Sequence, residues 1–381
     1  MRRLHAIDIL RALAIIWMVQ IHFVDNLGYL AQRDTPLYAV FVWFGFIPAP
    51  LFTFLAGASL FLSLRKHPPE AARARVLQRG AIIFGVGLVH NLINWGWDAL
   101  FDWDILTLIG SALIIVYLLR RLNWLGIAAL IGGILVISPI LRELTGYNLH
   151  WNFLLDEYTY ALTLRDLFLG WLLQGTFPLL PWVAFPLAGY AAGRALLGES
   201  ATPRRCCSPA GAVIGTGISA LGLGLLGILV SRYYGESLSA PWNGYFTPVM
   251  FYPASTTYLL VALGGALIAF AALWLLLDAD QHSRARFHWE RAPLFPVVQR
   301  YSRYSLSVYV IHHSIHLWPV YLAGWLYMGD RWYFYENAMP IWAALAFWGI
   351  FVLAFGYVSA LWDRIQGRYS LEWMLARLLR G

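Results

Sequence analysis

Four ionisable side chains share one face of the first apolar stretch of the chain, and they are Asp8, Arg11, His22 and Asp25. At ~100° per residue along a helix, they fall within an arc of roughly 100°. A charged group inside a membrane span costs at least ~2.5–3.5 kcal/mol, so such groups normally face a wet or protein-lined interior. We therefore expect this face to line an internal site.

His22 and Asp25 are the leading candidates for catalysis. Their i, i+3 spacing puts both side chains on one helix face. A carboxylate near an imidazole fixes the tautomer of the ring and raises its basicity, as a general base requires. The alternative is a buried, hydrogen-bonded histidine that only holds helices together. The other charges on this face favour His22 as the base, oriented by Asp25.

Arg11 and Asp8 lie nearer the start of the same face. We expect Arg11 to bind an anionic group of a cofactor, because a guanidinium matches phosphate geometry. An ion pair between Arg11 and Asp8 that fixes the end of the helix explains the same two residues equally well. The sequence leaves this choice open.

Another apolar stretch, near the end of the chain, carries a polar face made of Ser305, Tyr309, His312 and His316. The four fall within an arc of roughly 60°, and His313 adds a third histidine. Histidines at i, i+4 can chelate a metal, but no nearby acidic or Cys ligand completes a site, so we expect no metal. A polar pocket wall is the preferred interpretation. His312 would contact a cofactor, and Tyr309 and His316 the substrate.

The third apolar stretch combines a basic start with a polar end. Arg79 and His90 share a face, and Asn94 follows near the end. Other basic residues precede Arg79, and they are Arg65, Lys66, Arg73 and Arg75. Such a cluster suits phosphate binding, although plain anchoring at the inner membrane face explains most of it. We single out Arg79 for the cofactor and Asn94 for the substrate.

The elements that must position these residues are membrane helices. The chain has 381 residues, of which 60% are hydrophobic and 12% charged, against roughly 25% charged residues in soluble domains. The net charge of +7 does not indicate nucleic acid, because no soluble basic domain is visible. The 19 Trp and 21 Tyr suit interfacial belts, and also a sugar pocket. Cys206 and Cys207 are adjacent and imply neither a disulfide framework nor a zinc site.

The hydropathy pattern predicts an all-α polytopic membrane protein, one domain over residues 1–381. We expect ten spans, at about 7–30, 40–64, 79–95, 105–119, 124–141, 168–195, 210–231, 255–277, 304–325 and 340–362. The sixth is interrupted by Pro178, Pro181 and Pro186, which favours a short helix after a re-entrant segment. A short amphipathic helix at about 369–380, capped by Ser370, ends the chain.

The charge distribution supports this count. With the N-terminus inside, most of the 27 basic residues fall in the inner segments, and most acidic residues fall outside. Both termini are then cytoplasmic. The outer loops around 143–167 and 232–254 are long, aromatic and polar, whereas the inner loop 278–303 is basic and holds His282 and His288.

Several motifs resemble one known family. They are Ile7 to Arg11 followed by ten residues and then His22, Phe54 to Ser63, Asp104 to Gly110, Phe177 to Trp182 with Gly189 and Gly193-Arg194, Phe251 to Ser255, and Tyr304 to His312. Together, and in this order, they resemble the transmembrane acyltransferases. That group includes heparan-alpha-glucosaminide N-acetyltransferase and its bacterial relatives, and more distantly the acyltransferase-3 proteins. The chain departs from the pattern at Ala12, where a Gly is usual.

The resemblance implies an enzyme of the plasma (inner) membrane that transfers an acetyl or other short acyl group. The donor would be cytosolic acetyl-CoA, docked at the basic inner face. The acceptor would be an amine or hydroxyl of an extracytoplasmic sugar, with Trp182 among the residues that bind it. His22 would remove the acceptor's proton, and a covalent acetyl-histidine is a second route. A homodimer is left open, and no nucleic acid is expected.

Two functions from other classes compete with this one. A transporter or proton-coupled permease would also place histidines and charges inside membrane helices. The absence of a clear inverted repeat counts weakly against it. A non-catalytic membrane scaffold does not explain the charged face of the first span. Binding of acetyl-CoA distinguishes the acyltransferase from the transporter, because a transporter has no reason to bind it.

Overall fold

The computed structural model describes residues 4–152, 157–198, 208–239, 242–246, 250–279 and 289–379. Cys206, Cys207, His282 and His288 therefore lie outside the described residues. Two compact units result, one from 1–52 with 276–381, and the other from 53–275. Almost all described elements are helices, as predicted. The exceptions are strands of two residues, β1 (Trp151–Asn152) and β2 (Glu157–Tyr158), which pair antiparallel.

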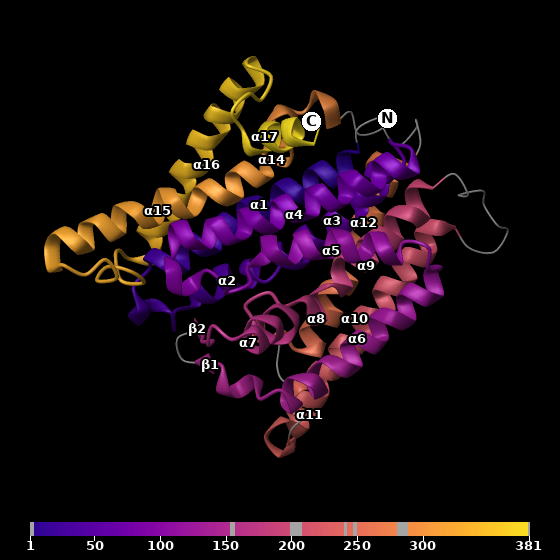
Figure 1. Cartoon of the computed structure of the whole chain (residues 1–381), viewed down its shortest axis with the longest axis horizontal. Helices are drawn as coiled ribbons and strands as arrows, with labels where there is room; N and C mark the ends of the chain where they lie inside the picture. Colours follow the sequence, from indigo (N-terminus) through magenta and orange to yellow (C-terminus); the bar gives the residue numbers. More distant parts are fainter. Residues whose placement is uncertain are drawn as a thin grey trace. The chain divides into compact units, whose positions relative to one another are not determined.

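The first unit is built around its N-terminal helix. Its helices are α1 (His5–Leu27), α2 (Pro36–Gly45), α14 (Phe295–Arg303), α15 (Ser305–Met328), α16 (Ile341–Arg364) and α17 (Leu371–Leu378), with 3-10 turns η1 (Leu30–Gln32) and η6 (Trp289–Arg291). Helix α1 packs against α2, α14, α15 and α16, and α1 and α15 can be followed side by side in Figure 1. A side chain on the α15 face of α1 thus lies against another helix of the same unit.

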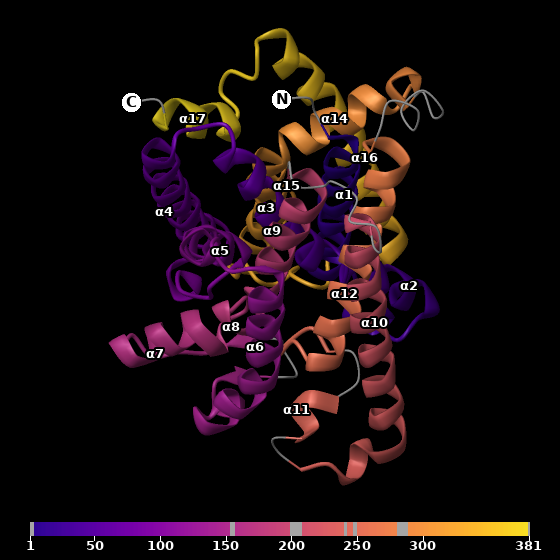
Figure 2. The same cartoon turned by 90° about the vertical axis from the view of Figure 1, so that its right-hand side faces the viewer.

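The second unit contains the middle of the chain. Its helices are α4 (Pro69–Asn94), α5 (Ile105–Leu119), α6 (Trp124–Leu144), α7 (Leu164–Leu169), α8 (Leu179–Trp182), α9 (Ala184–Leu197), α10 (Pro209–Tyr234) and α11 (Trp242–Phe246), with η2 (Trp97–Ala99), η3 (Tyr147–Leu149), the π-helical turn η4 (Gly170–Gln174) and η5 (Gly235–Ser237). Figure 2 shows α4 beside α5, and the two helices pack against each other. Helices α3 (Pro48–Leu64) and α12 (Thr256–Leu277) each cross the boundary between the units.

Helices occupy all ten predicted spans. Eight helical segments among the described residues are long and apolar enough to cross a membrane, and α5 is a shorter apolar helix. The ninth span corresponds to α15, whose 24 residues include the three histidines. The chain is thus a multi-pass membrane protein, while the number of crossings stays a prediction.

Three predicted spans differ from the observed helices in detail. The first was expected to reach about residue 30, and α1 ends at Leu27. The third was expected to begin near residue 79, and α4 begins at Pro69. The second, expected at about 40–64, falls within one candidate crossing, Pro36–Leu64, in which α2 ends at Gly45 and α3 begins at Pro48. Proline lacks an N–H and disfavours helical geometry at the residue before it, so the helix stops ahead of Pro48.

The predicted break in the sixth span is confirmed. Helix α7 ends at Leu169, the π-helical turn follows, and α8 starts after Pro178. Pro186 does not take part in the break, because it lies in the first turn of α9. An N–H at that position has no partner within the helix, so its absence costs little. The re-entrant path stays a prediction.

The start of α1 is held by a carboxylate from far along the chain. Asp278 accepts hydrogen bonds from the backbone N–H groups of His5 (3.1 Å) and Ala6 (2.9 Å). Leu4, at the N-cap position, has no side chain that could do this. A carboxylate also suits the positive end of the helix dipole. Asp278 therefore fixes the axial position of the helix that carries His22.

Topology is open to a direct labelling measurement. With both termini inside, the loop 278–303 is cytoplasmic, so we expect a cysteine introduced by Ser283→Cys to react with a membrane-impermeant maleimide only after the cells are opened. The native Cys206 and Cys207 should first be replaced by Ser. Labelling from outside intact cells would reverse the predicted orientation, and with it the side from which acetyl-CoA is expected.

Candidate active site

His22 of α1 meets the histidines of α15. The ring of His22 lies 5.3 Å from that of His312 and 4.5 Å from that of His313, measured between centroids. His312 and His313 are themselves 4.0 Å apart. His312 is fully buried, His313 is nearly so, and His22 is partly buried. The structure thus joins the two polar faces that the sequence analysis had singled out separately.

Backbone carbonyls define the tautomers of two of these rings. Nδ1 of His312 lies 2.6 Å from the carbonyl oxygen of Tyr309, and Nδ1 of His316 lies 2.7 Å from that of His312. A carbonyl only accepts, so each Nδ1 must carry the proton and each Nε2 the lone pair. Nε2 of His316 lies 2.8 Å from the amide nitrogen of Asn26, which donates to it. The α15 histidines are therefore oriented by their own helix and by α1.

Other predicted residues of the first unit are distributed along α1 and α15. The Asp25 carboxylate accepts a hydrogen bond from the Tyr38 hydroxyl at 2.9 Å, so its partner role toward His22 stays a prediction. Asp8 accepts a hydrogen bond from Ser302 at 2.6 Å. Arg11 is partly buried on α1, and Tyr309 is buried with its ring 5.8 Å from that of His312.

A second imidazole and carboxylate pair lies in the other unit. Nδ1 of His90 is 3.6 Å from a carboxylate oxygen of Asp104, and both residues are buried. The other carboxylate oxygen of Asp104 caps α5 by accepting from the N–H groups of Leu106 and Thr107. Asn94 is also buried, and its amide donates to the carbonyl oxygen of His90. His90 and Asn94 were expected from the sequence as polar residues of one span, whereas the pairing of His90 with Asp104 was not.

Two further predicted residues have contrasting surroundings. Arg79 is exposed on α4, so a charged ligand can reach its side chain. Trp182 is 1% exposed and packs against Phe177, Phe185 and Phe251. This packing gives Trp182 a place in the core of its unit, and a substrate contact for it stays a prediction.

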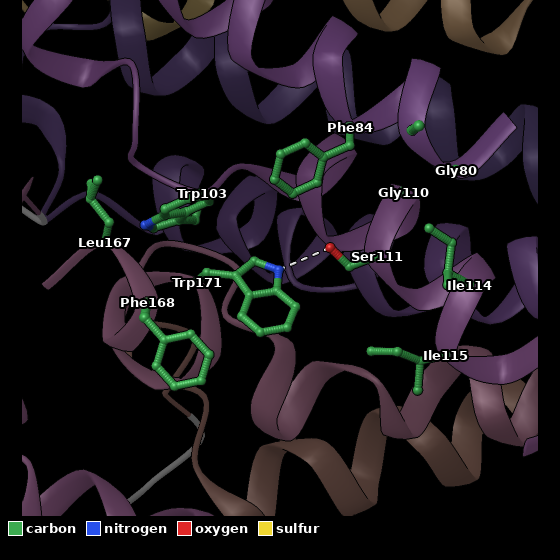
Figure 3. A pocket seen from close by; sticks show the side chains of 11 residues that line it. Gly80, Phe84, Trp103, Gly110, Ser111, Ile114, Ile115, Leu167, Phe168 and Trp171 are labelled. Atoms are coloured by element: carbon green, nitrogen blue, oxygen red, sulfur yellow. Dashed lines mark hydrogen bonds between the residues drawn. The ribbon is translucent and has the colours of Figure 1, made fainter. Parts of the chain in front are cut away.

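An apolar cavity of about 550 Å³ opens beside α4 and α5. Figure 3 shows Phe84, Ile114 and Trp171 among the residues that line it. The indole N–H of Trp171 donates to the Ser111 hydroxyl at 2.9 Å. Trp103 also borders the cavity and belongs to a buried aromatic cluster with Tyr147, Trp151 and Tyr158. Part of this cluster comes from the loop 143–167, which the sequence analysis described as aromatic and polar.

The chain was compared with known protein families. Residues 3–236, more than half of its length, match the family "Heparan-alpha-glucosaminide N-acetyltransferase, catalytic". The chain belongs to this family. A search of curated proteins returned no match. Membership confirms the resemblance found in the sequence and makes the protein a transmembrane acetyltransferase.

The matched range divides the candidate residues of this acetyltransferase into two groups. His22, Arg79 and the His90–Asp104 pair lie inside residues 3–236. The histidines of α15 lie beyond it, although His22 contacts two of them. The family match therefore leaves the α15 side of the cluster to be interpreted from the structure.

Glu372 is a residue that the sequence analysis missed. Its carboxylate accepts from the N–H groups of Leu306 (2.7 Å) and Ser307 (3.0 Å) and from the Ser307 hydroxyl (2.6 Å). It thus caps the first turn of α15, as Asp278 caps α1. The only available signal was an isolated acidic residue in a tail of apolar and basic side chains. The Ser370 cap of α17 was predicted, and its hydroxyl accepts from the N–H of Trp373 at 3.2 Å.

We expect Glu372→Ala to destabilise the acetyltransferase by ~1–3 kcal/mol, because three donors lose their acceptor. Glu372→Gln keeps one acceptor oxygen and should lose less. Burial raises the pKa of Glu372 above its ordinary value of 4.5. The stability of the wild type relative to Glu372→Gln should then fall as pH rises from 4.5 through the pKa of the folded state. Thermal melts in detergent across this range test the prediction, and a constant difference would contradict it.

Proposed function

We propose that this acetyltransferase moves an acetyl group from acetyl-CoA to an amine or hydroxyl of an extracytoplasmic sugar, with His22 as the general base. One observation carries the proposal, namely the position of His22 on α1 against His312 and His313. An ionisable group enclosed between membrane helices is costly and normally serves function. Family membership supports the acetyl group as the part transferred.

The reaction needs one proton transfer and one bond exchange. The acceptor nitrogen or oxygen attacks the carbonyl carbon of the thioester while His22 takes its proton. The C–S bond then breaks, and CoA leaves as the thiolate. Asp25 would orient His22. In the first unit, His312 would lie near the acyl donor, and Tyr309 and His316 would bind the acceptor. In the second unit, Asn94 and Trp182 are separate candidates for acceptor binding.

The two substrates would approach from opposite sides of the plasma membrane. Acetyl-CoA is cytosolic and anionic, so we propose Arg79 in the second unit as a residue that binds a phosphate, and Arg11 in the first unit as a separate candidate for this role. The sugar would enter from the outer aromatic loops, because aromatic faces suit the apolar faces of sugar rings. With a longer acyl chain or a different glycan as substrate, the acyl group would still pass from a cytosolic donor to an extracytoplasmic acceptor.

The decisive experiment measures acetyl-CoA binding and acetyl transfer on the purified full-length protein. We expect saturable binding of acetyl-CoA and transfer of radiolabelled acetyl to a glucosamine-containing acceptor. Binding of acetyl-CoA without transfer to any of a panel of amino sugars and hydroxyl sugars would overturn the proposal that the acceptor is a sugar. No binding of acetyl-CoA, together with proton-coupled uptake of a solute into proteoliposomes, would favour the transporter.

Arg79→Ala tests the cofactor side. We expect it to weaken CoA binding by ~1.5–3 kcal/mol, the usual contribution of a hydrogen bond to a charged group. Arg121→Ala is the matched control, because Arg121 is also exposed and lies in the next predicted inner segment. Isothermal titration with CoA measures both variants. Equal losses would mean that only general electrostatic attraction is involved.

A further inference from the structure

The three histidines between α1 and α15 have a geometry suited to a metal ion. His22, His312 and His313 each offer a ring nitrogen, and these nitrogens lie within 4.8 Å of one another. Tetrahedral Zn²⁺ with Zn–N bonds of ~2.0–2.1 Å requires ring nitrogens ~3.3 Å apart. The separation exceeds this by at most about 1.5 Å, a difference that small adjustments of the side-chain torsions can close.

The surroundings of His312 match those of a metal-bound imidazole. Metal-ligating histidines usually donate their other ring N–H to a carbonyl or carboxylate, which fixes the tautomer. His312 does this through Nδ1, which lies 2.6 Å from the carbonyl oxygen of Tyr309. Its Nε2 therefore carries the lone pair that a metal needs. His312 and His313 are almost fully buried, so their rings have little freedom to turn away.

We propose that His22, His312 and His313 together bind a divalent transition-metal ion, with a fourth coordination position left open. Three neutral imidazoles without a carboxylate favour Zn²⁺ and its neighbours over Mg²⁺ or Ca²⁺, which prefer oxygen. No metal was expected from the sequence, because no nearby acidic or Cys ligand completes a site with the histidines of the late span. The third imidazole comes instead from α1, about 290 positions earlier in the chain.

A bound ion would have a consequence for catalysis. Coordination occupies the same lone pair on His22 with which a general base takes up a proton. This consequence, inhibition of transfer by the ion, rests on the proposed function, whereas binding of the ion does not. The two statements can therefore fail separately.

Co²⁺ and Zn²⁺ are suitable probes for the chelator-treated full-length protein in detergent. We expect one Co²⁺ to bind per chain with the intense visible absorption of a tetrahedral complex, and Zn²⁺ to displace it. His312→Ala and His313→Ala should each lower affinity by more than the ~10–100-fold typical of an outer-shell change. His150→Gln is the control, because His150 lies in another part of the chain and bonds the Thr159 carbonyl.

The outcomes separate the site from adventitious binding. The proposal would be overturned if Co²⁺ gave no tetrahedral spectrum. It would also be overturned if the wild type and His313→Ala bound the ion equally, because other histidines would then be the ligands. His313→Gln, with a thermal melt like that of the wild type, guards against loss of binding through unfolding. Zn²⁺ binding that leaves transfer unchanged would keep the metal site and remove His22 from its role as base. His22-dependent transfer without any Zn²⁺ binding would keep His22 as the base and remove the metal site.

Discussion

His22→Ala should reduce the rate of acetyl transfer by at least ~10²-fold, the usual contribution of a positioned general base. The affinity for acetyl-CoA should stay nearly unchanged, because the imidazole acts on the acceptor and not on the nucleotide. The measurement is single-turnover transfer of labelled acetyl, with CoA binding followed separately by titration. Chelator should be present throughout, so that metal binding at the same histidines does not contribute.

Two further variants distinguish a base from a packing residue. Asp25→Asn should lower the rate less than His22→Ala, because it disturbs orientation and leaves the base in place. His22→Gln keeps much of the volume and hydrogen bonding of histidine but cannot take up a proton at neutral pH. A folded His22→Gln protein with full transfer would show that His22 only packs. The buried His90–Asp104 pair would then be the next candidate for the base.

Gly189→Ala should prevent proper packing of the second unit. A methyl group at Gly189 would overlap the carbonyl oxygen of Phe54 on α3, and one at Gly57 would overlap that of Pro186 on α9. Both obstacles are backbone atoms, so neither helix can yield by turning a side chain. We expect a loss at or beyond the upper end of the ~1–3 kcal/mol typical of overpacking. Recovery of monodisperse protein and its thermal midpoint measure it.

Gly85→Ala and Gly133→Ala are the matched controls. A methyl group at either position meets nothing within 4 Å, and both lie inside helices. Since alanine is the better helix former, we expect them to be neutral or slightly stabilising. If Gly189→Ala behaves like these controls, then the close approach of α3 and α9 is not needed for stability. The presence of Gly189 in the motif that resembles the acyltransferase family would then need another explanation.

The sequence by itself determined the membrane class, the helices and most of their ends. Runs of apolar residues long enough to span a bilayer are a local property, so they can be counted without knowing any contact. Local caps such as Ser370 on α17 are also readable, because the acceptor and the amide lie within three residues. The motifs gave the family. Even the break before α8 followed from proline chemistry, although the pattern did not reveal that Pro186 is tolerated or that the second span is divided.

The candidate site was predictable in its members and not in its assembly. Helical periodicity put His22 on one polar face and His312 with His316 on another. It could not place these faces together, because the residues are about 290 positions apart and no local pattern encodes their contact. Periodicity also placed His313 outside the predicted polar face. In the structure, the centroid of its ring lies 4.5 Å from that of His22.

Only the tertiary structure decided how the two histidine-bearing helices are held. Helix α1 begins at the Asp278 carboxylate, and α15 begins at the Glu372 carboxylate. In each case the terminal amides are satisfied by a residue that local sequence cannot identify, since helix caps are normally sought within a few residues. The same holds for His90 and Asp104, which are joined by the packing of α4 on α5. Such pairings arise when distant segments meet, because burial favours pairing of the polar groups that it removes from water.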